Sequence, residues 1–314
     1  MIHALLLSLI VMAPSGGTAQ QGGATHVLLI TGLSGEPRFA KIFGAIAGSI
    51  YDAAHVQWHV GDSDLVYLAE DPAADPGRIS DKSSKAAVEH AFASLARRVH
   101  AGDLVFVFLL GHGSGEMAAS AVNLPGPDPT AADYAAWLAP LGRATIVFVN
   151  ASSASGDFAP VLAGPNRVIV TATKTAIERN ESIFASYFVQ GLTGTEADAD
   201  KDGRVSIVEA FNYARDQVAK AYESTHRLQT EHAMLVDSSG VAADIAFGGD
   251  ASSLDPRVTA LVGERRVLES RVDSLRQLKA AMDSTVYQRS LEQLLLQIAV
   301  KTQAIRALQS GPRP

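Results

Sequence analysis

The apolar residues of the first 240 positions follow two alternating patterns. Short, continuous runs rich in Val, Ile and Leu are typical of strands buried on both faces, and they occur at 26–31, 65–68, 104–110, 145–150 and 167–173. Between them, apolar residues recur every three or four positions, which predicts helices at 38–54, 83–100, 130–141, 181–192 and 206–224. This alternation predicts an α/β domain over residues 20–240, with a mostly parallel sheet flanked by helices.

The last sixty residues follow a different pattern. A seven-residue repeat of apolar side chains begins the segment, at Leu261, Leu268, Leu275 and Met282. A second apolar seam follows, interrupted by Lys301, at Tyr287, Leu291, Leu294, Ile298, Ile305 and Leu308. These seams predict an α-helical hairpin of coiled-coil type over 255–309, after a linker at 241–254 and before a frayed tail at 310–314. The hairpin either packs on the domain or acts as a docking arm, or forms a homodimer.

Composition narrows the class of protein. The chain has 314 residues and a net charge of -7, and it contains no single-sign charge run, which disfavours a nucleic-acid partner. Residues 1–19 contain no Asp, Glu, Lys or Arg, and their apolar run, 4–12, is too short to span a membrane. We therefore expect a signal peptide cleaved near Ala19, a secreted or periplasmic protein, and no membrane span.

Two strand ends carry the side chains best suited to chemistry. The run at 104–110 continues into GHGSG, and the run at 145–150 continues into ASSASG. Because consecutive parallel strands end on one edge of a sheet, we expect His112 and Ser152 to lie close together. His112 would then be a general base, Ser152 a nucleophile, and the Gly113 amide an oxyanion donor. Other serines remain as alternative nucleophiles, at positions Ser114, Ser153 and Ser155.

These two segments, LVFVFLLGHGS (104–114) and TIVFVNASSASGDF (145–158), resemble the paired motifs of caspase-like cysteine peptidases, legumain-type ones in particular. The resemblance implies a caspase-like fold over about residues 25–235. It places the family's catalytic histidine on His112, its acidic residue on Asn150 and its catalytic cysteine on Ser152. Arg38 is the nearest match to the arginine that lines the family's substrate pocket.

The absence of cysteine changes what that resemblance implies. A thiol has a pKa within reach of a neighbouring histidine, whereas the hydroxyl of Ser152 needs a far stronger activating environment. The favoured hypothesis is therefore a catalytically impaired, peptidase-like protein that binds a peptide or a partner protein. One alternative is an active serine-variant peptidase or hydrolase that uses Ser152 and His112. Another is a scaffold that acts through the carboxyl-terminal hairpin.

A second motif indicates a metal. The stretch DADKDGRVSIVE at 198–209 fits the EF-hand loop D-x-D-x-D-G-x5-E, with Gly203 at the sharp turn. Four carboxylates on one short loop repel each other unless a divalent cation neutralises them, and hard oxygen ligands favour Ca²⁺. We expect one structural calcium site. Its ligands would be the carboxylates, the residue-204 carbonyl and a water-bridging hydroxyl, drawn from Asp198, Asp200, Asp202, Arg204, Ser206 and Glu209.

Overall fold

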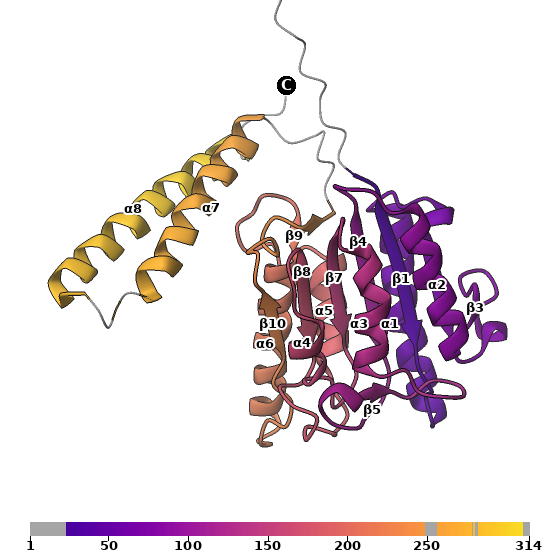
Figure 1. Ribbon diagram of the computed structural model, residues 1–314. Coiled ribbons are helices and arrows are strands. Elements are labelled where there is room, and N and C mark those ends of the chain that lie inside the picture. Colours follow the sequence, from indigo (N-terminus) through magenta and orange to yellow (C-terminus); the bar gives the residue numbers. More distant parts are fainter. Residues whose placement is uncertain (1–22, 249–255, 278, 280–281, 310–314) are drawn as a thin grey trace, which may run out of the picture.

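The computed structural model describes residues 23–248, 256–277, 279 and 282–309. The expected signal peptide, most of the second half of the expected linker and the tail at 310–314 lie outside the described residues. The described part consists of an α/β domain and a pair of long helices beside it (Figure 1).

A seven-stranded sheet forms the centre of the domain, in the order β10-β8-β7-β4-β1-β2-β3. Every neighbouring pair is parallel except β10 with β8. The continuous apolar runs predicted these central strands because both of their faces are buried. The strands are β1 (Thr25–Thr31), β2 (Leu65–Ala69), β3 (Asp81–Lys82), β4 (Leu104–Leu110), β7 (Thr145–Asn150), β8 (Arg167–Thr171) and β10 (Met234–Asp237).

Three helices cover each face of the sheet. On one face, Phe106 and Phe108 of β4 pack with α1 (Pro37–Val56), α5 (Phe184–Thr193) and α6 (Ile207–Ser224). On the other, Val105 and Val107 pack with α2 (Lys85–Arg98), α3 (Ala131–Leu138) and α4 (Phe158–Leu162). Alternate residues of one strand thus fill two separate cores, as the two-residue period of a strand requires.

Short elements complete the domain. Two small antiparallel ladders pair β5 (Gly113–Ser114) with β6 (Ala121–Val122), and β9 (Val205–Ser206) with β11 (Ala246–Phe247). The described 3₁₀ turns are Asp62–Asp64, Pro72–Ala74, Met117–Ala119 and Ala139–Leu141. Sequence patterning missed α4 and the short strands β3, β5, β6, β9, β10 and β11. The linker expected at 241–254 therefore has to be corrected, since β11 belongs to the domain.

The carboxyl-terminal segment forms two helices, α7 (Pro256–Gln277) and α8 (Ser284–Gln309), which pack on each other. Val258 and Ile305 are buried between them, with Leu261 and Leu308 beside them. Lys301, which interrupts the second apolar seam, contacts the Glu264 carboxylate of α7. Among the described residues, no helix has the length and apolar character needed to cross a membrane.

Candidate functional site

The two strand ends predicted to carry chemistry do lie side by side. β4 and β7 are adjacent and parallel, paired from Leu104–Thr145 to Leu109–Asn150. His112 and Ser152 therefore follow neighbouring strands at one edge of the sheet, which we call the carboxyl edge. β5 marks this edge at the bottom of Figure 1, and β9 lies at the opposite edge.

His112 is firmly oriented. Its Nε2 lies 3.2 Å from the carbonyl oxygen of Ser34, which can only accept a hydrogen bond. Nε2 therefore carries the proton of the neutral ring, and Nδ1 keeps a lone pair. Phe39 meets the imidazole edge-on at 4.7 Å between ring centroids, and Phe43 lies at 5.5 Å. Ser34 is fixed in turn, because its amide and hydroxyl both donate to Glu70, at 2.8 and 2.7 Å.

The Ser152 side chain is bonded to Asn150. Its side chain has no exposed surface, and its hydroxyl donates to Asn150 Oδ1 at 2.6 Å. The Ser152 amide donates to the same oxygen at 3.1 Å, which fixes the orientation of the Asn150 amide group. Among the described residues no hydrogen bond joins Ser152 to His112. The predicted nucleophile is therefore at the predicted edge, but its hydroxyl is buried and already bonded.

Ser153, the next residue, shares a cavity with the histidine. It lines a small cavity of about 20 Å³ together with His112 and Glu181, and it is 5% exposed. The Gly113 amide, which we expected to be open to an oxyanion, donates to Ser153 Oγ at 3.2 Å. A cavity of this size has room for about one water molecule, so it offers no pocket for a substrate side chain.

Arg38, at the start of α1, lies at the rim of this cavity. Its Nη1 is 3.4 Å from Glu181 and its Nε is 3.0 Å from Glu36. Its guanidinium also lies 4.3 Å above the Phe39 ring. Two carboxylates thus offset the positive charge of the side chain expected to bind substrate. Sequence patterning assigned no role to Ser34 or Glu70, because the hydrogen bond between them joins residues far apart in the chain.

The loop at 198–209 brings its carboxylates together. One oxygen from each of Asp198, Asp200 and Asp202 lies within 4.8 Å of the others. The loop backbone supports these groups: the amides of Asp202 and Gly203 donate to Asp198 at 3.1 and 3.0 Å. Gly203 has φ +85°, the left-handed conformation that the sixth position of an EF-hand loop requires.

Glu209, the twelfth loop residue, reaches back across the loop. Its Oε1 accepts the amides of Ala199 and Asp200 at 3.0 and 3.2 Å. Its Oε2 accepts the amide and hydroxyl of Ser206 at 2.9 and 2.8 Å, which caps α6. Three aspartate oxygens therefore converge in the loop, and Glu209 lies across it; carboxylate oxygens of this kind fit a hard cation such as Ca²⁺.

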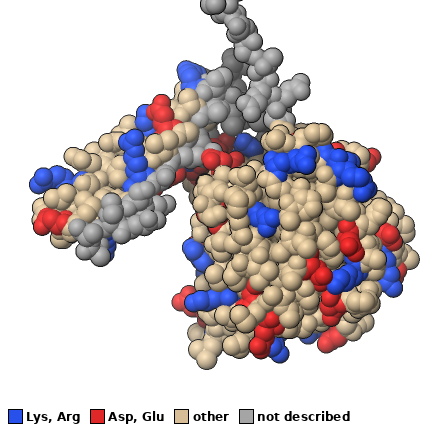
Figure 2. Space-filling model, viewed as in Figure 1, with Lys and Arg blue, Asp and Glu red and all other residues tan. Residues whose placement is uncertain are grey.

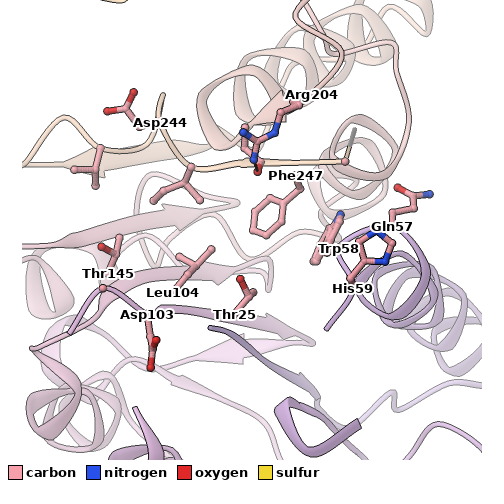
Figure 3. A pocket seen from close by; sticks show the side chains of 15 residues that line it. Thr25, Gln57, Trp58, His59, Asp103, Leu104, Thr145, Arg204, Asp244 and Phe247 are labelled. Carbon is pink, nitrogen blue, oxygen red and sulfur yellow. Dashed lines mark hydrogen bonds between the residues drawn. The ribbon is translucent and has the colours of Figure 1, made fainter. Parts of the chain in front are cut away.

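The loop is braced by a distant part of the chain. β9, which holds its eighth and ninth positions, pairs with β11, Val205 opposite Phe247. Phe247 packs on Trp58 at 4.2 Å between ring centroids and on Phe106 at 5.5 Å. The Arg204 guanidinium contacts the Ala246 carbonyl, above a cavity of about 570 Å³ (Figure 3). The loop is thus anchored to the sheet through β11.

Comparison with known proteins identifies no family. No protein-family model and no curated protein matches the chain. Among solved structures, the crystal structure of protein GSU0716 from Geobacter sulfurreducens aligns with 71% of this chain and 97% of its own. Its sequence identity is 9% and its TM-score is 0.44, values too low to carry a functional argument.

Proposed function

We propose that this protein is a calcium-binding, non-hydrolytic member of the caspase-like fold class, whose carboxyl edge binds a peptide or a partner protein. The observation that carries the proposal is the hydroxyl of Ser152. This residue stands where the resemblance places the catalytic cysteine, yet its hydroxyl is fully buried and donates to Asn150. A nucleophile needs an activating base within hydrogen-bond reach, and His112 forms no hydrogen bond with it.

The surface around His112 is suited to binding. Met117 and Ile177 are 76% and 81% exposed, on loops that Arg179 and Glu116 join through a 3.6 Å ion pair. The Ile177 loop is also tied to the turn after β7, because the Ala154 amide donates to the Glu178 carbonyl at 2.9 Å. Large apolar side chains exposed on supported loops favour contact with another polypeptide.

A phage-displayed random heptapeptide library, panned on the full chain in calcium, tests this function. We expect enriched peptides that lose at least about tenfold in affinity with Ile177→Glu, since each 1.4 kcal/mol of lost contact costs tenfold. Val56→Glu is the matched control, because Val56 is 66% exposed but lies at the far end of α1. Equal loss in both variants, or no enrichment, would contradict peptide binding at the carboxyl edge.

A second function, serine hydrolysis, is favoured by one observation: Ser153 lines the same cavity as His112. Intact-mass labelling with a fluorophosphonate distinguishes the two functions in the same samples. A non-hydrolytic protein gives no adduct. A single adduct that is lost in both Ser153→Ala and His112→Ala would establish a hydrolase and overturn the proposal.

The calcium site is tested by isothermal titration with Ca²⁺. Wild type should bind one ion, and Glu209→Gln should weaken binding at least about tenfold, because one of four carboxylates is lost while glutamine preserves the helix cap. Glu223→Gln, an exposed position on the same helix, should bind like wild type. Equal affinity of Glu209→Gln and wild type would exclude the loop as the calcium site.

A further inference from the structure

An arginine of the hairpin lies on the calcium loop. The Nη2 group of Arg265, on α7, contacts the Asp200 carboxylate, and its Nη1 lies 3.3 Å from the Asp200 carbonyl oxygen. Its Nε is 3.3 Å from Glu269, one turn further along α7. Arg265 is only 2% exposed, so its guanidinium is buried at the junction of hairpin and domain.

Through this contact, the Arg265 guanidinium occupies a carboxylate that the proposed calcium ion would also need. Asp200 is the third position of the loop and one of the three aspartates whose oxygens converge. A guanidinium on this carboxylate offsets part of the negative charge that attracts a metal ion. Figure 2 shows acidic side chains where the hairpin meets the domain. Because like charges in a partly desolvated site repel strongly, a calcium ion there and the Arg265 guanidinium destabilise each other.

We propose that Arg265 is a built-in competitor of calcium, so that calcium binding and docking of the hairpin oppose each other. The inference rests on the proposed calcium site and adds its regulation. By thermodynamic linkage, the factor by which the docked Arg265 lowers calcium affinity equals the factor by which bound calcium lowers the docking equilibrium of the hairpin. Low calcium keeps the hairpin against the loop, and high calcium releases it.

The two helices of the hairpin have a buried core of their own, so we expect them to stay paired after release from the domain. This buried apolar cluster consists of Val258 and Ile305, with Leu261 and Leu308 against them, and all four belong to the hairpin itself. Lys301 and Glu264 add an ion pair between its two helices. Undocking therefore breaks the charged contact at Asp200 while the helix pair keeps its own core.

Calcium titration of the full chain tests the competition. Arg265→Gln should bind Ca²⁺ at least about fivefold more tightly than wild type, the lower end of typical allosteric coupling. Arg271→Gln, which removes an exposed arginine from the same helix, should match wild type. Equal or weaker affinity of Arg265→Gln would overturn the inference while leaving the calcium site intact. If neither protein binds calcium, the proposed site fails as well.

Docking is measured independently with spin labels. The chain has no cysteine, so Lys220→Cys on α6 and Gln293→Cys on α8, both exposed, give a single labelled pair. Double electron–electron resonance in EGTA should give one narrow distance distribution. In saturating Ca²⁺ this distribution should broaden and shift to longer distances. With Arg265→Gln the broad distribution should be present in EGTA too. A distance unchanged by calcium in wild type would overturn the release of the hairpin.

Discussion

At the scale of single residues, the adjacent serines Ser152 and Ser153 have different environments. The buried Ser152 hydroxyl donates to Asn150 Oδ1, whereas Ser153 lines a cavity together with His112. The Asn150 Nδ2 is buried without a hydrogen-bond partner among the described residues. Such an unsatisfied donor costs about 1–3 kcal/mol, which the close packing around β7 must offset.

Cysteine substitution makes the difference between the two serines measurable. Because the chain has no native cysteine, Ser152→Cys and Ser153→Cys each carry one thiol. We expect iodoacetamide to alkylate Ser153→Cys at least about tenfold faster in the native state, since reactivity follows exposure and proximity to a base. The two rates should become equal in 6 M guanidinium. Faster native alkylation of Ser152→Cys would contradict the described orientation of this turn.

At the scale of elements, helix caps decide where helices begin. Thr130 and Asp133 form a reciprocal capping box on α3, and Lys85 of α2 donates to Asp133 at 2.7 Å. Burial by itself would raise the pKa of Asp133, but the Lys85 ammonium and the Thr130 amide and hydroxyl together outweigh it. The pKa of Asp133 therefore lies below its ordinary value.

This lowered pKa gives a pH-dependent contribution to stability. The ionised carboxylate stabilises the fold above the unfolded-state pKa, about 3.9, and that stability is lost as pH falls through the lower folded-state pKa. Asp133→Asn should therefore cost about 0.5–1 kcal/mol in urea unfolding at pH 6, and less at pH 3. Asp216→Asn, at an exposed site, should show no such trend. A cost that grows on acidification would refute this account.

At the scale of the whole molecule, Phe247 connects the loop at 198–209 to the central sheet. It lies on β11, opposite Val205 of the loop, and packs on Trp58 and Phe106. The loop lies at the edge of the sheet opposite His112, so the sheet and its helices separate the two sites (Figure 1). The hairpin contacts this loop through Arg265 and Asp200.

Phe247→Ala should therefore weaken both folding and calcium binding. Removal of a buried phenylalanine costs about 3–5 kcal/mol, and loss of the β11 anchor frees the loop. Phe158→Ala is the matched control: Phe158 is fully buried, but it packs on Phe148 and Tyr134 across the sheet. It should cost similar unfolding free energy and leave the calcium affinity of the folded protein unchanged. Equal calcium affinity in both variants would contradict the bracing role of β11.

The local pattern of apolar residues was sufficient to predict most of the central strands and long helices. The continuous apolar runs predicted β4 and β7 at the bounds observed, because strands buried on both faces need apolar side chains at every position. It was less reliable at ends and for short elements. α5 begins at Phe184, later than expected, where the Glu231 carboxylate accepts the Ile183 and Phe184 amides.

By itself, the sequence determined the α/β class, the edge shared by His112 and Ser152, and the spacing of acids in the loop at 198–209. These follow from periodicity and connection rules that act over short stretches. Tertiary structure decided which serine shares a cavity with His112, what braces the loop at 198–209, and that Arg265 lies on Asp200. Those contacts join residues from 40 to 65 positions apart, and no local pattern specifies them because they depend on how the layers pack.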